Sequence, residues 1–239
     1  MPKSDIELIQ GDCIKVLGEI EAESVDMIFA DPPYNLSGAT SLTVRSGKPV
    51  VCHKGKWDEV VNLHQFNLLW IDACKRVLKP SGTIWISGTL HNHPSTGIAL
   101  KELKWWILND VIWFKPNATP LLSRNRFAPS TELIWVASKD KKYYFNYALA
   151  KEMNNGKQMR NLWTITAKRH LTEHPTEKPE DLLERIIRIG SREGDAILDP
   201  FFGSGTTGVV AKRLGRRFIG IELDKKYFKM GKKRIELSK

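Results

Sequence analysis

Four consecutive residues in the first part of the chain carry groups suited to chemistry on an amino nitrogen. Asp31-Pro32-Pro33-Tyr34 follows the apolar run 25–30, which has the composition of a buried strand. An amino nitrogen on a base ring is a poor nucleophile, because its lone pair is delocalised into the ring. The Asp31 carboxylate and the Pro32 carbonyl could each accept one amino hydrogen and direct that lone pair toward an electrophile.

The rest of this motif fits the same chemistry. The two prolines hold the acceptors rigidly, and Tyr34 offers an aromatic face on which a base taken out of a duplex could stack. The alternative is a rigid proline turn with no chemical role. Because ligands of α/β sheets bind at the carboxyl ends of strands, the position of the motif favours the chemical role.

A glycine-rich turn near the other end of the chain predicts a nucleoside cofactor. The segment Asp199-Pro-Phe201-Phe-Gly203-Ser204-Gly205-Thr206-Thr207-Gly follows a predicted strand, 196–199, and precedes a predicted helix. Glu222 ends the next strand, 217–222, where it can accept hydrogen bonds from ribose hydroxyls. The Asp199 carboxylate would repel a pyrophosphate but attract a sulfonium and an ammonium, so S-adenosylmethionine is favoured over NAD. Considered alone, Asp199 also suits a turn or a helix cap.

The elements around these motifs predict an α/β fold with a mostly parallel sheet. We expect helices over 59–79 and 179–189, a helix ending at Leu214, a last helix after Glu222, and a strand over 83–87. The intervening segment 115–172 is rich in Asn, Arg, Lys, Pro and aromatic residues, so we expect it to carry specificity rather than core. Segment 37–56 is expected to be a mobile loop.

Composition sets wider limits. The chain has 239 residues, 41% of them hydrophobic, and a net charge of +10, which predicts one soluble domain or two small ones and a polyanionic partner. Cys13, Cys52 and Cys74 have no CxxC spacing, so neither a disulfide framework nor a structural zinc site is indicated. We expect a reducing, cytoplasmic location, no membrane span and no metal ion.

With these motifs in this order, the chain resembles the β class of amino-group DNA methyltransferases, close to the type that modifies adenine, over nearly its whole length. In that class Asp-Pro-Pro-Tyr comes first, a target-recognition region follows, and Phe-x-Gly-x-Gly comes last. Segment 174–179, His-Pro-Thr-Glu-Lys-Pro, matches a further motif of the family.

The resemblance implies a Rossmann-like, circularly permuted methyltransferase sheet with an inserted target-recognition region. On this basis 1–114 would be the catalytic half, 115–172 the target-recognition region and 173–239 the cofactor half. It implies transfer of a methyl group from S-adenosylmethionine to adenine N6 in a short sequence of duplex DNA by base flipping. The enzyme would belong to a restriction-modification system or act as an orphan methylase, with an endonuclease and a second copy of the chain as expected partners.

The resemblance also implies roles for individual residues. The catalytic residues would be Asp31, Pro32, Pro33 and Tyr34. The cofactor would be bound by Asp12, Cys13, Asp31, Lys178, Asp199, Phe201, Gly203, Ser204, Gly205, Thr206, Thr207 and Glu222, with Lys178 at the methionine carboxylate and Glu222 at the ribose.

DNA contacts are expected from the middle region. Its cations can bind guanine edges or phosphates, and its amides can bind adenine. The candidates are Arg124, Arg126, Arg160, Lys168 and Arg169, with Asn117, Asn125 and Asn161.

Several alternatives stay open. An Asp at position 31 favours adenine, but cytosine N4, RNA or a glutamine side chain could be the acceptor. A nucleotide-dependent oxidoreductase would share the glycine turn but has no use for Asp31 to Tyr34, and a non-catalytic DNA-binding module would leave both motifs unexplained.

Three further patterns are assigned to structure rather than chemistry. The His91-Asn92-His93 triplet lacks the context of a nuclease metal site. The basic run 225–234 is expected to be a solvated helix face, with Leu223, Phe228 and Ile235 on the apolar side. Trp105, Trp106 and Trp113 are expected in the core, whereas Trp57 and Phe127 are not assigned.

Overall fold

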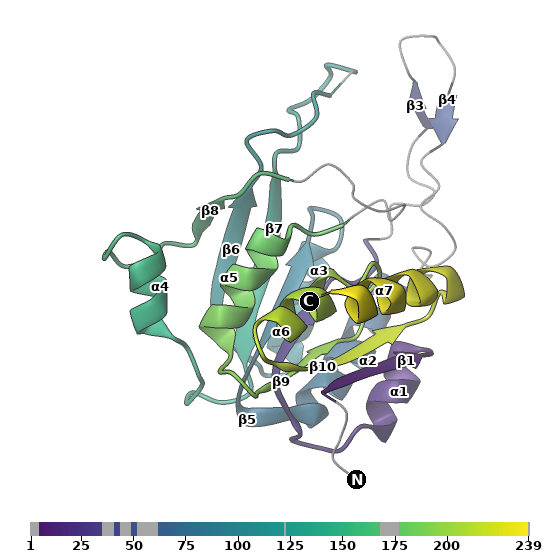
Figure 1. Ribbon diagram of the computed structural model, residues 1–239. Coiled ribbons are helices and arrows are strands. Elements are labelled where there is room, and N and C mark those ends of the chain that lie inside the picture. Colours follow the sequence, from purple (N-terminus) through teal and green to yellow (C-terminus); the bar gives the residue numbers. More distant parts are fainter. Residues whose placement is uncertain are drawn as a thin grey trace.

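The computed structural model describes residues 5–34, 41–43, 49–51, 62–121, 123–167 and 177–238. In this part of the chain, one mixed sheet of eight strands lies between two layers of helices (Figure 1). Its strands, in spatial order, are β1 (Ile6–Gln10), β10 (Arg217–Glu222), β9 (Ala196–Asp199), β2 (Val25–Ala30), β5 (Leu78–Gly88), β7 (Thr131–Ser138), β6 (Trp106–Phe114) and β8 (Leu162–Thr164). The short strands β3 (Ser41–Thr43) and β4 (Pro49–Val51) pair separately and antiparallel.

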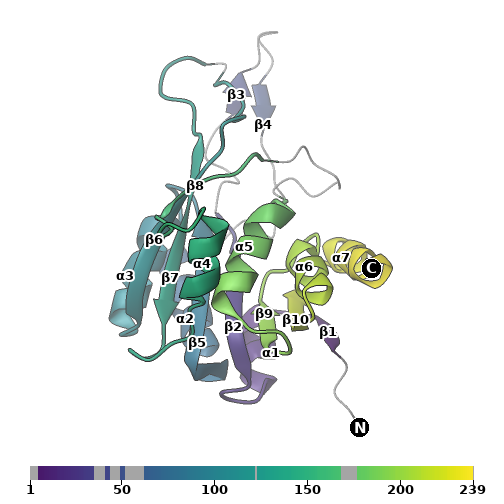
Figure 2. The same cartoon turned by 60° about the vertical axis from the view of Figure 1, so that its left-hand side comes forward.

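The helices form one layer on each face of the sheet. The first layer holds α1 (Cys13–Glu19), α2 (Leu63–Val77) and α3 (His93–Glu102), and the second holds α4 (Tyr147–Met153), α5 (Glu180–Gly190), α6 (Thr206–Arg213) and α7 (Lys225–Leu237). The two views agree on this layering (Figures 1 and 2). Strand β2 shows why both layers are needed: Met27 and Phe29 pack in one hydrophobic core, and Ile28 and Ala30 in the other.

The direction of the connections creates a binding edge. Neighbouring strands from β1 to β5 are parallel, and β7 is antiparallel to both β5 and β6. The chain leaves β2 through α2 toward β5, and leaves the adjacent β9 through α6 toward β10 on the other side. Such a switch point, at the carboxyl ends of two neighbouring strands, is where open α/β sheets bind ligands.

The predicted α/β fold with a mostly parallel sheet is confirmed, and its elements shift by a few residues. The helix expected over 59–79 covers Leu63–Val77, and the strand expected over 83–87 extends over Leu78–Gly88. The extension begins at Leu78, which pairs with Val25, and residues 79–82 form an irregularity before the pairing continues at Thr83 opposite Met27.

The expectation that 115–172 lies outside the core is wrong for one strand. This range contains β7, which lies between β5 and β6 and buries Ile134, Val136 and Ala137. Residues 133–137, Leu-Ile-Trp-Val-Ala, form the continuous apolar run that is typical of a strand covered on both faces, so β7 carries the same kind of signal as 25–30. The inserted part is therefore smaller than the range implies.

Three side-chain expectations also need correction. Trp105 and Trp113 are buried as predicted, but Trp106 is 48% exposed with the Lys141 ammonium 5.1 Å from its ring centroid. Leu223 is exposed rather than on the apolar side of the last helix. Arg234 does not face solvent, because it forms ion pairs with two glutamates of another segment.

The basic residues that precede Arg234 on α7 are otherwise mostly exposed, and Phe228 and Ile235 pack inward. Among the described residues, no helix is long and apolar enough to cross a membrane.

The packing of α7 against the glycine turn predicts the effect of a single methyl group. A Cβ on Gly231 would lie 2.8 Å from the Gly203 carbonyl oxygen and 3.1 Å from the Gly205 nitrogen. Because backbone atoms cannot yield cheaply, we expect Gly231→Ala to lower the free energy of unfolding by about 1–3 kcal/mol, measured by urea denaturation.

Gly18→Ala is the matched control for this substitution. A Cβ at Gly18, in α1, meets nothing within 4 Å. That variant should be as stable as the wild type or more stable by up to ~1 kcal/mol, because alanine favours the helix. Equal stability of the two variants would contradict the packing argument.

Candidate active site

Polar side chains from four strands meet at the edge of the sheet described above. Asp31, Ser87, Asp199 and Glu222 stand at or next to the carboxyl ends of β2, β5, β9 and β10. Glu132 reaches the same edge from the start of β7, because that strand runs antiparallel and its Leu133 pairs with Gly88.

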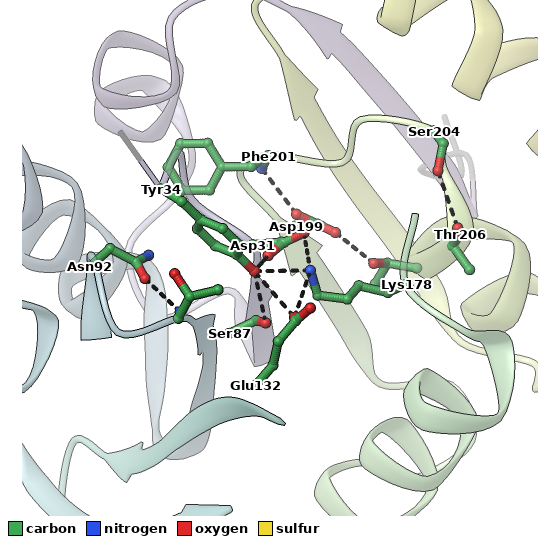
Figure 3. A network of polar contacts seen from close by, with 12 residues as sticks. Asp31, Tyr34, Ser87, Asn92, Glu132, Lys178, Asp199, Phe201, Ser204 and Thr206 are labelled. Carbon is green, nitrogen blue, oxygen red and sulfur yellow. Dashed lines mark hydrogen bonds and ion pairs between the residues drawn. The ribbon is translucent and has the colours of Figure 1, made fainter. Parts of the chain in front are cut away.

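The centre of this edge is a hydrogen-bonded group of charged residues, shown in Figure 3. The Lys178 ammonium donates to Asp31 Oδ2 at 2.6 Å and to Tyr34 Oη at 3.0 Å, and it forms an ion pair with Glu132 Oε2 at 3.3 Å. The Tyr34 hydroxyl in turn donates to Asp31 Oδ1 at 2.5 Å. Ser87 Oγ lies 3.2 Å from that hydroxyl.

A second lysine balances the charge of this group. Lys115 forms an ion pair with Glu132 Oε1 at 3.1 Å, so two carboxylates face two ammonium groups. Burial alone would raise the pKa of Glu132, but Lys178 and Lys115 lower it below its ordinary value. Burial likewise opposes the charge of Lys178, yet Asp31 and Glu132 hold its pKa well above 10.5. Both residues are therefore charged at neutral pH.

The glycine turn is organised around two other carboxylates. Asp199 is buried and accepts hydrogen bonds from Phe201 N at 3.0 Å and Thr207 Oγ1 at 2.6 Å. Glu222 accepts from Gly203 N at 3.0 Å and from Asp224 N at 2.8 Å. Asp199 thus fills the role of a turn former that its sequence context also suited, and each carboxylate keeps lone pairs for a ligand.

The glycine at position 205 has a packing reason. Its φ of 80° is left-handed, and a Cβ there would lie 2.9 Å from the Gly231 carbonyl oxygen of α7. Glycine is thus required at this position because the backbone of the turn lies close to helix α7, whether or not a ligand also lies close to it.

One cavity connects the two motifs, as the sequence predicts. It has a volume of about 30 Å³, and its walls include Asp31, Lys178, Asp199, Phe201, Gly203, Ser204, Thr206 and Thr207. Acidic groups at the ends of two adjacent strands suit the cationic centres of S-adenosylmethionine, so the residues present fit that cofactor.

The first turn of α1 lies beside this region. Gly11 N donates to the Glu222 carbonyl at 3.0 Å, which brings the end of β1 next to Glu222. Asp12 caps α1 by accepting from Lys15 N at 3.0 Å. Burial raises the pKa of Cys13 to about 12, so its thiol is neutral.

Two expected roles differ from the contacts in the structure. Lys178 is bound to Asp31 and Glu132, so a role at the methionine carboxylate stays a prediction. Tyr34 is buried, with the Lys178 ammonium 5.3 Å from its ring centroid, so a base must displace side chains before it can stack there. Phe201 packs edge-on against Trp70, with ring centroids 5.3 Å apart.

The expected DNA-binding residues are spread over several segments. Arg124 and Arg126 are exposed on the connection between β6 and β7, and Arg160 is exposed before β8. Phe127, on the same connection, is 98% exposed. Lys168, Arg169, Trp57, Cys52 and residues 174–176 lie outside the described part of the chain, as do most residues of 37–56.

The expected adenine-binding amides are mostly engaged within the protein. Asn117 bonds both backbone groups of Ala167, and Asn161 donates to the Asp110 carbonyl, so these two hold loops together. Asn125 accepts a hydrogen bond from Ser123.

His93 stacks on Trp135 with ring centroids 4.5 Å apart, as a histidine of the protein interior.

Sequence analysis did not identify Ser87, Lys115 or Glu132. Ser87 ends a predicted strand, so the same edge rule that located Asp31 could have located it. Glu132 and Lys115 carried no such signal, because the edge rule points to the carboxyl end of a strand, whereas the antiparallel β7 brings its first residues to this edge.

Comparison with known proteins identifies relatives of the whole chain. Residues 25–233 match the N6/N4 methyltransferase family model, described as DNA methylase. The chain is 51% identical, over 98% of its length and 91% of the relative's, to type II methyltransferase M2.DpnII of Streptococcus pneumoniae. Among solved structures it matches the M1.HpyAVI–SAM complex, with a TM-score of 0.73, 29% identity and coverage of 97% and 100% of the two chains. The fold also matches PvuII DNA methyltransferase (cytosine-N4-specific), with a TM-score of 0.76, 20% identity and coverage of 97% and 86%.

The environment of Asp199 predicts a pH dependence of stability. Burial, reinforced by Asp31 and Glu222, raises the pKa of Asp199 from 3.8 to about 7, against the hydrogen bonds from Thr207 and Phe201. Between these two values the folded protein holds a proton that the unfolded chain releases, so stability from this group is lost as the pH rises from about 4 to about 7.

We expect the wild type to lose stability relative to Asp199→Asn over this range, by an amount of the order of 4 kcal/mol. Urea denaturation of both proteins at several pH values measures the difference. Parallel stability curves would show that Asp199 titrates normally.

Proposed function

Because this chain belongs to the N6/N4 family of DNA methylases, we propose that it transfers the methyl group of S-adenosylmethionine to the exocyclic amino nitrogen N6 of adenine in a short sequence of duplex DNA. The observation that carries the proposal is a cavity that borders both Asp31 of the first motif and Asp199 of the second. Such a cavity brings an acceptor for amino hydrogens next to a site for a cationic methyl donor.

The proposed cofactor site uses residues from both ends of the chain. Asp199, Ser204, Thr206 and Thr207 would surround the methionine part, and Glu222 with the first turn of α1 would face the nucleoside part. When bound, S-adenosylmethionine supplies an electrophilic methyl group. Asp199, charged above its pKa of about 7, attracts the cationic end of the ligand.

The proposed catalytic residue is Asp31. Its carboxylate accepts an amino hydrogen of the flipped base, and the Pro32 carbonyl accepts the other, so the nitrogen lone pair is turned toward the methyl group. Tyr34 fixes the carboxylate through the hydrogen bond from its hydroxyl to Oδ1, and its ring face is the proposed stacking surface. An Asp in the first position of this motif favours adenine, and cytosine N4 is the alternative.

The remaining parts of the proposal concern DNA and partners. The circularly permuted order of motifs agrees with a catalytic half over 1–114 and a cofactor half over 173–239, with target recognition by the irregular segments of 115–172. Likeness to M2.DpnII supports a type II methyltransferase within a restriction-modification system. A cognate endonuclease and a second copy of the chain are proposed partners.

Removal of the Asp31 carboxylate tests the central role. We expect Asp31→Ala to slow methyl transfer by about 100- to 1000-fold, because the acceptor for the amino hydrogen is lost. Methyl-labelled cofactor, mixed-sequence duplex DNA and mass analysis of the digested nucleosides measure the rate and identify the base.

Cofactor affinity, measured by calorimetry, should stay within a few-fold of that of the wild type. The matched control is Asp5→Ala, which removes an exposed carboxylate before β1 and should leave turnover unchanged. Undiminished turnover of Asp31→Ala would rule out the assigned role.

The proposed DNA contact of Arg126 is tested by salt. Removal of one phosphate contact should reduce the slope of log affinity against log salt by about one. We expect this for Arg126→Ala but not for Lys101→Ala, a substitution of an exposed lysine at the end of α3 remote from the edge. Equal slopes for the wild type and Arg126→Ala, measured by fluorescence anisotropy, would show that Arg126 makes no phosphate contact.

A further inference from the structure

We propose that Lys178 occupies the place of the target amino group while no base is bound, and that Glu132 is a positioning residue that takes Lys178 over when a base reaches Asp31. The inference rests on the proposed function, because it assumes that Asp31 accepts an amino hydrogen. It adds a role for two residues, Glu132 and Lys115, that belong to neither sequence motif.

Both carboxylate oxygens of Asp31 already accept hydrogen bonds. Its Oδ1 accepts the Tyr34 hydroxyl, and its Oδ2 accepts the Lys178 ammonium at 2.6 Å. An ammonium N–H is the same kind of donor as the amino group of a base. The side chain of Lys178 is only 6% exposed and that of Asp31 16%, so this pair lies inside the site rather than on its rim.

Lys178 also takes up space beside Asp31. Both residues line the cavity that borders Asp199, and this cavity measures about 30 Å³. Because Lys178 is the donor on Asp31 Oδ2, it is the group that the amino nitrogen must replace there.

Lys178 has a second carboxylate within reach. Its ammonium lies 3.3 Å from Glu132 Oε2, so it can leave Asp31 and keep an ion pair by tightening this contact. Moving a buried ammonium away from its carboxylate without such a partner is strongly unfavourable. Lys115 holds the other Glu132 oxygen at 3.1 Å and thereby fixes the position of the acceptor.

The charge balance supports the exchange. The amino group of a base is neutral, so the site contains two ammonium groups and two carboxylates before and after the base enters. Asp31 then keeps its full negative charge for the amino hydrogens while Lys178 remains paired. If Asp31 were the sole carboxylate, Lys178 would stay bound to it and compete with the base.

The position of Glu132 also relates this exchange to DNA binding. Lys115 and Glu132 stand at the two ends of the β6–β7 connection, which Lys115 N closes by donating to the Ser130 carbonyl at 2.7 Å. Arg124 and Arg126, proposed to contact DNA, lie on this connection. Phosphates bound there would therefore act on the segment that holds the acceptor for Lys178.

The test compares Glu132→Gln with one variant that keeps the negative charge and one that removes the competing lysine. We expect kcat of Glu132→Gln to fall by about 100-fold, with cofactor affinity unchanged, because Lys178 stays on Asp31 and displaces the amino group from its productive position. Glu132→Asp keeps the charge and should lose less. The double variant Glu132→Gln/Lys178→Met should turn over at least about tenfold faster than Glu132→Gln, because nothing then competes for Asp31.

Two readouts separate this role from a merely structural one. Fluorescence of 2-aminopurine placed next to the target adenine should show weaker base extrusion by Glu132→Gln than by the wild type. Glu102→Gln, which removes an exposed carboxylate next to His64, is the matched control and should leave both rate and extrusion unchanged. If Glu132→Gln does not fold, the test is a crystal structure of the wild type bound to a duplex that it methylates in the assay. In that structure Lys178 should contact Glu132 and not Asp31.

The outcomes distinguish the two proposals. A wild type that binds cofactor but labels no DNA would overturn the proposed function and this inference together. If the wild type is active, each of three results would overturn the inference alone. These results are an unimpaired Glu132→Gln, a double variant no faster than Glu132→Gln, and Lys178 still on Asp31 in the DNA complex.

Discussion

The ion pair between Lys178 and Asp31 is the contact on which the site depends. It joins residues 147 positions apart: Asp31 follows strand β2, and Lys178 stands just before helix α5. Four acidic side chains gather at this edge, three at the ends of parallel strands and Glu132 at the start of β7, and such a gathering would be self-repelling without cations. Lys178 and Lys115 supply the cations, and with Asp31 and Glu132 they form a neutral, largely buried cluster.

Much of this arrangement was predictable, because strand ends are marked by local sequence. Asp31 and Asp199 each follow a short apolar run and precede a turn, and the rule that strand ends share one edge brings them together. The partners of Lys178 were not predictable in the same way. Its contacts cross most of the chain, and Glu132 reaches the edge because β7 is antiparallel to β5, a direction that the apolar run 133–137 does not reveal.

The glycine turn shows a limit of motif interpretation. The glycine-rich turn predicts a nucleoside cofactor, yet the tightest constraint on Gly205 comes from the carbonyl of Gly231 in the last helix. Helix α7 and the cofactor site therefore share a backbone segment. A motif can be retained for packing and binding at once, because the same absence of a side chain serves both.

The antiparallel course of β7 has a consequence for how such proteins diversify. Because β6 ends at the edge and β7 starts from it, the residues at the two ends of their connection are fixed by the sheet, whereas the connection itself is not. Its length and composition can drift between lineages without moving Lys115 or Glu132. A change in this surface segment therefore leaves the charged cluster at the edge undisturbed.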